Sequence, residues 1–211
     1  MPPFATLADS QRWNATSGDL SLDFVNTGQW NETGPWPERL QRFRDLVRWA
    51  RDAGTLAPDR SSRLLEAGER HPHHAQGAFD RALQLRGVLH AIFDSLAEQR
   101  CPAHSDLHVL DDELATAFAV AHLEYRDGRI VREWSEDAED FGQVLRPIVW
   151  AATELLLGER VTRLRACASP QCRRLFLDES RNGMRRWCDM QVCGSRAKAR
   201  RYYERRVDRD V

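Results

Sequence analysis

The chain has 211 residues, of which 42% are hydrophobic and 30% charged, a balance typical of a folded globular protein rather than a disordered one. No stretch approaches 18 consecutive apolar residues, and residues 1–6 lack the basic start and apolar core of a secretory signal. We therefore expect no membrane span and a cytoplasmic protein.

The net charge of −1 conceals a strong asymmetry along the chain. Residues 160–211 contain 15 basic and 6 acidic residues, whereas residues 1–159 contain 16 basic and 26 acidic ones. We therefore expect two domains, 1–159 and 160–211, and a polyanionic partner for the basic domain.

Apolar residues recur at helical intervals through most of the first domain. The pattern from Leu40 to Ala50 predicts a helix that Gly54 ends, and Pro58 fits the first turn of a second helix over about 58–70. A third, longer helix is expected before Pro102, and residues 107–121 predict either a fourth helix or a helix that runs into a strand.

The last part of the first domain mixes strand and helix signals. Two alternating runs, 120–125 and 130–134, flank Asp127-Gly128 and predict a β-hairpin. The acidic stretch 136–140 is expected to open a helix that Gly158 closes. The fold class is therefore α+β but mainly α, a helical N-terminal domain with a β-hairpin followed by a small C-terminal module.

Four of the five cysteines lie within 27 residues and have the spacing C-x4-C, 15 residues, C-x4-C: Cys167, Cys172, Cys188 and Cys193. Two close pairs of thiolates suit a tetrahedral structural zinc site, which would leave no open position for catalysis. We therefore predict one structural Zn²⁺ per chain. Two disulfides, an iron–sulfur cluster or a chance group of buried thiols are the alternatives.

The segments around the cysteines predict a treble-clef-like finger. Residues 173–178 resemble a short strand, Asn182-Gly183 a turn and 185–187 a return strand, while the residues after Cys193 have a helical composition. A unit of this size has too small an apolar core to fold alone, so metal binding would stabilise it.

The helix expected after Cys193 is rich in cations, and Lys198, Arg201 and Arg205 fall on one side of it. Such a surface suits the phosphate backbone of DNA or RNA. The predicted nucleic-acid contacts are Arg185, Arg186, Arg196, Lys198, Arg200, Arg201 and Arg205. Alternatively, the helix is merely solvated, or it docks on the acidic domain of the same chain.

Two motifs carry a family resemblance. The segment from Cys167 to Arg201 resembles the CGNR zinc finger, with Cys193-Gly194-Ser195-Arg196 at the last cysteine and Ser where the family has Asn. The run 20–27 resembles the opening of the ABATE domain, which precedes this finger in bacterial proteins. The resemblance implies a stress-responsive transcription regulator whose finger binds DNA and whose N-terminal domain senses a ligand.

Three polar residues in the run 20–27, namely Asp23, Asn26 and Thr27, are candidates for orienting a small-molecule effector. They could equally cap a helix or close a turn. Arg86, on the long apolar helix, is a candidate ion-pair partner for Asp23.

No nucleophile elbow, phosphate-binding glycine loop or H-E-x-x-H motif supports enzymatic activity. Our hypothesis is a bacterial DNA-binding regulator, with a homodimer as a possible assembly. The alternatives are an RNA-binding or protein-interaction adaptor that uses the same finger, and an enzyme with a pocket in the N-terminal domain.

Overall fold

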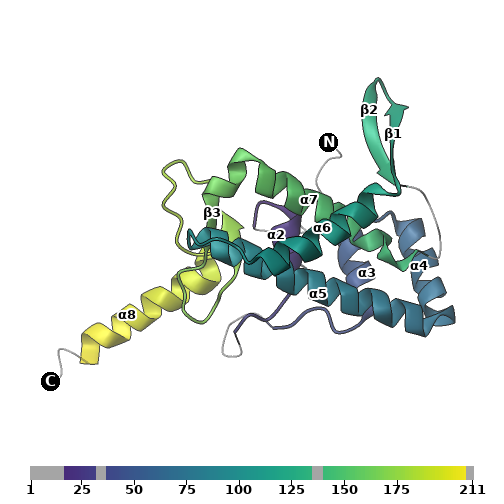
Figure 1. Cartoon of the computed structure of the whole chain (residues 1–211). Coiled ribbons are helices and arrows are strands. Elements are labelled where there is room, and N and C mark those ends of the chain that lie inside the picture. Colours follow the sequence, from purple (N-terminus) through teal and green to yellow (C-terminus); the bar gives the residue numbers. More distant parts are fainter. Residues whose placement is uncertain (1–16, 32–36, 135–139, 208–211) are drawn as a thin grey trace.

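The computed structural model describes residues 17–31, 37–134 and 140–207, and within the last helix it describes the side chains up to residue 200 and that of Tyr202. The N-terminal part is a bundle of helices around the long α5, and the C-terminal part lies at one end of this bundle (Figure 1). The helices of the bundle are α2 (Leu20–Val25), α3 (Phe43–Asp52), α4 (Pro58–Arg70), α5 (Pro72–Ala97), α6 (His104–Phe118) and α7 (Arg146–Leu157).

The four predicted helices are present as α3 to α6; α4 has the expected bounds, whereas α3 begins three residues later than Leu40 and α6 begins and ends three residues earlier than the expected 107–121. Gly54 follows α3 with a left-handed φ of +74°, and Pro58 is the first residue of α4. The expected helix after the acidic stretch begins later than predicted, because a 3₁₀ turn, η1 (Phe141–Val144), precedes α7. The acidic residues 136–139 lie outside the described residues.

The core of the bundle is apolar and continuous. Phe24 and Val25 of α2 are fully buried, and Phe24 packs with its ring centroid 5.3 Å from that of Trp49 in α3. Asp19 precedes the short helix α2 and caps it, because its side chain accepts a hydrogen bond from the Ser21 N–H. Helix α2 is thereby fixed between α5 and α7, the position from which it reaches the C-terminal part.

The predicted hairpin is present as β1 (Ala121–Arg126) and β2 (Arg129–Trp134). Its turn residues Asp127 and Gly128 have φ values of 52° and +79°, as the mirror-image turns of tight hairpins require. In Figure 1 the hairpin extends outward from the bundle.

The C-terminal part contains a two-stranded sheet different from the expected one. Its elements are the 3₁₀ turn η2 (Glu159–Arg163), β3 (Leu164–Ala166), β4 (Leu175–Leu177), the π-helical turn η3 (Met190–Gly194) and α8 (Ser195–Val207). The predicted hairpin between 173–178 and 185–187 is wrong, since β4 pairs antiparallel with β3 and residues 185–187 form no strand. Leu164 and Leu177 are buried against the bundle, and this burial stabilises the pairing of β3 with β4.

The strands of the C-terminal part belong to the core of the bundle. Leu164, Leu175 and Leu177 are each at most 1% exposed and lie in the same apolar cluster as the helices. Helix α8, by contrast, points away from the bundle (Figure 1). Within the described residues, no helix has both the length and the apolar character needed to cross a membrane.

Candidate metal centre and nucleic-acid interface

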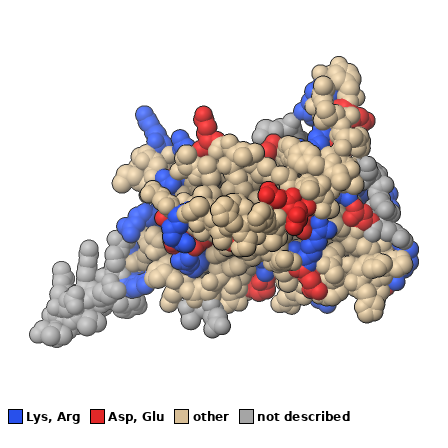
Figure 2. All heavy atoms as spheres, in the orientation of Figure 1, with Lys and Arg blue, Asp and Glu red and all other residues tan. Residues whose placement is uncertain are grey.

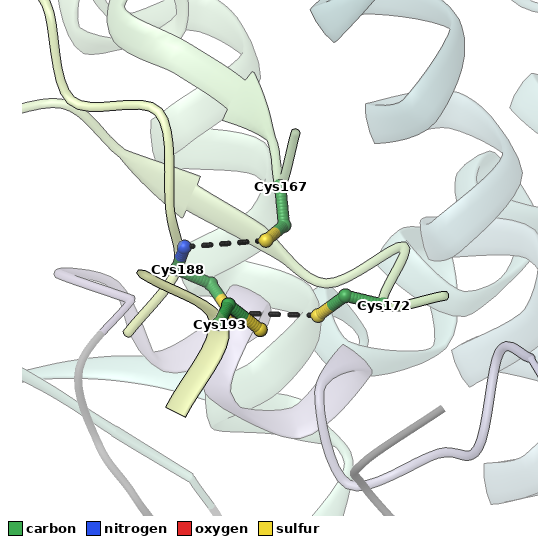
Figure 3. A group of neighbouring side chains, drawn as sticks. All are labelled: Cys167, Cys172, Cys188 and Cys193. Atoms are coloured by element: carbon green, nitrogen blue, oxygen red, sulfur yellow. Dashed lines mark hydrogen bonds between the residues drawn. The ribbon is translucent and has the colours of Figure 1, made fainter. Parts of the chain in front are cut away.

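The four predicted zinc ligands converge on one point between the strands and α8. Cys167 directly follows β3, Cys172 lies in the loop to β4, Cys188 precedes η3, and Cys193 lies within η3. Their sulfur atoms all lie within 4.8 Å of one another and point toward a common centre (Figure 3). All four side chains are buried.

The sulfur spacing fits a tetrahedral zinc site. A Zn–S bond of about 2.3 Å implies tetrahedron edges of about 3.8 Å between sulfurs. The Sγ atoms of Cys172 and Cys188 are 3.5 Å apart, and those of Cys188 and Cys193 are 3.8 Å apart. A disulfide would need about 2.05 Å, and all four thiols are free. The cluster therefore holds one structural zinc ion, with four sulfur ligands filling its coordination shell.

The electrostatics of the bare cluster also call for a cation. Burial raises the pKa of the Cys193 thiol, and the neighbouring Cys172 and Cys167 raise it further. The pKa of Cys167 is lowered, because Cys172 and Cys188 donate hydrogen bonds to its sulfur. Without a cation only one thiolate is well stabilised, whereas a divalent ion stabilises all four.

The backbone around the cysteines is fixed by local hydrogen bonds. The Cys167 N–H donates to the carbonyl of Arg174 at 2.8 Å, and the Cys172 N–H donates to Ser169 at 2.9 Å. At the second pair, the side chain of Asp189 accepts a 2.8 Å bond from the Val192 N–H and caps η3. These contacts make the two turns that aim each cysteine pair at the centre.

Arg185 supports the metal centre from outside. Its Nε donates to the carbonyl of Trp187 at 3.0 Å, and its guanidinium also donates to the carbonyl of Cys188. The guanidinium lies 4.4 Å from the ring centroid of the buried Phe176. This predicted nucleic-acid residue is therefore used inside the finger, a role that no sequence motif indicated.

The basic residues of the finger divide into two groups, of which the first faces the acidic domain. Arg173 donates two hydrogen bonds of 2.9 and 2.8 Å to the carboxylate of Asp94 in α5. Arg160 donates to Glu179 at 2.9 Å and lies 3.6 Å from Asp19. The basic finger thus docks on the acidic domain, but through these arginines rather than through α8.

The second group faces solvent. Figure 2 shows Lys and Arg side chains gathered at the end of the molecule from which α8 extends. The exposed predicted contacts are Arg186, Arg196, Lys198 and Arg200. The side chains of Arg201 and Arg205, also predicted contacts, lie outside the described residues. Ala197 lies on the buried side of α8 and is only 8% exposed.

Asn26 directly follows α2, and its side chain bonds to the backbone of Leu175 in β4 as a neighbouring β-strand would. Its side-chain amide donates to the carbonyl of Leu175 at 2.7 Å, and its side-chain oxygen accepts from the Leu175 N–H at 3.1 Å. Its own carbonyl accepts a 3.2 Å bond from Arg174. Asn26 is 4% exposed, so all these bonds are shielded from water.

The other two residues of the predicted ligand set also have partners within the protein. Asp23 accepts a 2.6 Å bond from the hydroxyl of Ser17, and the Thr27 hydroxyl donates to the Phe24 carbonyl at 2.7 Å. Arg86 pairs with Glu38 at 2.8 Å rather than with Asp23, which corrects that expectation. A ligand at Asp23, Asn26 and Thr27 stays a prediction.

The fold and the metal centre define a two-part class of protein, a helical domain to which a four-cysteine zinc finger is docked. The model of the ABATE family, described as "Putative stress-induced transcription regulator", matches residues 18–159, and the model of the CGNR zinc finger matches residues 163–206. The chain belongs to the ABATE family and carries a CGNR zinc finger. No curated protein sequence matched the chain.

Proposed function

We propose that this chain is a DNA-binding transcription regulator, in which residues 160–211 bind the duplex and residues 1–159 sense a small effector. The observation that carries the proposal is that Arg196, Lys198 and Arg200 are all exposed on a helix that leaves the bundle. Cations on both sides of a projecting helix suit insertion into a major groove, with arginine bound to phosphate or to guanine.

The zinc centre supports this function by holding the first turn of α8. Cys193 is a metal ligand one residue before Gly194, and the helix begins at Ser195. The chain's own residues then do the recognition, since Arg196 and Arg200 are one turn apart on one side of α8 and Lys198 lies on the other side. When bound, zinc supplies a fixed cross-link between η3 and the strands.

The contact between α2 and β4 offers a route from an effector to the finger. Any ligand that moves α2 would disturb the pair of hydrogen bonds between Asn26 and Leu175. The effector would therefore change DNA affinity by changing how the finger is held.

The test is a salt-titrated anisotropy assay of the full chain on a labelled duplex and on a structured RNA. Replacing Arg196, Lys198 and Arg200 by Gln should lower duplex affinity about 10- to 100-fold and reduce the salt slope by about 2 to 3. Arg201→Ala with Arg205→Ala should act in the same direction. The matched control replaces the exposed Arg44, Arg48 and Arg63 of α3 and α4 by Gln.

Equal losses in the α8 variant and the control variant would contradict the assignment of α8 as the contact surface. Tighter binding to structured RNA than to the duplex would contradict the choice of DNA and favour an RNA-binding adaptor.

A further inference from the structure

The β1–β2 hairpin carries an apolar face that the rest of the described chain leaves in water. The two strands pair mainly with each other, and the hairpin stands clear of the helices (Figure 1). A two-stranded hairpin by itself is marginally stable in water and needs packing on at least one face. The apolar face of the β1–β2 hairpin therefore needs a partner that packs against it.

The two faces of the hairpin differ sharply in chemistry. The register places Tyr125 opposite Ile130 and Leu123 opposite Arg132 on one face. The three apolar side chains on this face are strongly exposed, at 73% for Leu123, 74% for Tyr125 and 69% for Ile130.

The opposite face is built for solvent. On it Arg126 forms ion pairs with Glu124 at 2.6 Å and with Glu133 at 3.0 Å. The apolar side chains are therefore gathered on one side rather than scattered, which distinguishes an interaction surface from ordinary exposed residues.

The apolar face continues onto the bundle at the base of the hairpin. The guanidinium of Arg132 lies 3.6 Å from the ring centroid of Trp150 in α7 and 4.8 Å from that of Trp134. Phe118, at the end of α6, is 51% exposed and packs edge-on against Trp150 with a centroid separation of 5.3 Å. A strip of apolar and aromatic side chains thus runs from the tip of the hairpin to the body.

Arg132 on this face and Asp127 in the turn beyond it lack an ion-pair partner in the described part of the chain. Arg132 has a buried Nε without a hydrogen-bond partner, and Glu154 acts on it only at longer range. Asp127, at the tip, forms no ion pair with any described residue. Asp127 lies at the tip and Arg132 lies opposite Leu123 nearer the base, and the two form no ion pair within the hairpin.

We propose that this face binds a second copy of the same chain, with the two hairpins packed face to face and antiparallel. The two-fold axis passes through the Tyr125–Ile130 pair. Asp127 is two residues from Tyr125 toward the tip, and Arg132 is two residues from Ile130 toward the base, so the axis places each Asp127 over the Leu123–Arg132 pair of the second copy. This self-complementarity of charge is what a symmetric interface requires and what selects a second copy over an unrelated partner.

The hairpin is thus a dimerisation arm, and the proposal does not depend on DNA binding. Dimerisation would leave both α8 helices uncovered, because they extend from the other end of the molecule (Figure 1).

The test is sedimentation equilibrium of the full zinc-loaded chain without nucleic acid, over a wide range of protein concentrations. Leu123→Glu should raise the dimer dissociation constant about 100-fold or more, because each dimer buries the side chain twice. The matched control is His122→Glu, the same new charge one residue earlier on the solvent face, and it should change the constant less than threefold. Asp127→Asn, which keeps the left-handed turn, should weaken the dimer about three- to tenfold.

Circular dichroism and zinc content establish that each variant is folded. A wild-type chain that stays monomeric at every concentration would overturn the proposal, as would equal effects of Leu123→Glu and His122→Glu. A dimer that Asp127→Asn leaves unchanged would overturn the antiparallel register.

Discussion

Asn26 forms with Leu175 both of the hydrogen bonds that a neighbouring β-strand would form. One side chain thereby completes the edge of the finger's sheet from a helix 149 positions earlier in the chain. The side-chain amide of Asn26 has both a donor and an acceptor, so it satisfies the carbonyl and the N–H of Leu175 together. The finger is consequently part of the structure of the helical domain rather than a separate module on a linker.

Replacing Asn26 by Ala should lower the free energy of unfolding by roughly 2–4 kcal/mol, because two buried backbone groups of Leu175 lose their partners. Urea unfolding of the zinc-loaded chain measures this change. Asn31→Ala is the control, since the bond of 3.2 Å that the Asn31 side chain donates to the Pro170 carbonyl is exposed. A loss for Asn26→Ala no larger than for Asn31→Ala would contradict the docking role.

The ion pair between Arg173 and Asp94 should contribute a measurable, salt-sensitive coupling between the domains. The Arg173 side chain is 42% exposed and that of Asp94 is 10% exposed, so water screens the pair only in part. A double-mutant cycle with Arg173→Gln and Asp94→Asn should give a coupling of about 0.5–1.5 kcal/mol at low salt. The coupling should shrink as salt is added, and a coupling of zero at low salt would show that the bond does not hold the finger.

Asp23 should make the stability of the fold depend on pH in an unusual direction. Burial raises the pKa of Asp23 to about 6, although hydrogen bonds from Ser17 lower it. Between about pH 4 and pH 6 the folded chain holds a proton that the unfolded chain has lost. The free energy of unfolding therefore falls as the pH rises through this window.

Asp23→Asn removes the charge but keeps an oxygen that accepts from Ser17. Relative to wild type, the variant should gain roughly 1–3 kcal/mol at pH 7.5, and this gain should disappear near pH 4. Thermal unfolding across the pH range measures it, with the exposed Asp111→Asn as control. A gain that does not change with pH would contradict the raised pKa.

The parts of the fold that were predictable from sequence are those with a local signal. Helices α3 to α7 follow from apolar spacing and helix-end signals, the hairpin from Asp127-Gly128, and the metal centre from the regular spacing of four cysteines, whereas α2 was not predicted. Each of these signals lies within a short window, so no knowledge of distant contacts is needed.

The parts that failed depend on contacts between distant segments. The partner of β4 is β3, a three-residue strand with no alternation, and its pairing is favoured by burial on the bundle. Similarly, the bonds of Asn26 and Arg173 could not be predicted, because their partners lie 149 and 79 positions away. Arg185 could not be distinguished from its neighbour Arg186 without the position of the Phe176 ring.

One zinc ion bound by the four cysteines holds α8 in position. Its ligands are Cys167, Cys172, Cys188 and Cys193. Hydrogen exchange of the reduced full-length chain, before and after complete metal removal, tests this role of the zinc ion most directly, with metal analysis of both samples. We expect one zinc per chain, and after its removal a loss of amide protection over residues 185–200 while α5 stays protected. Unchanged protection over 185–200 in the metal-free chain would contradict it.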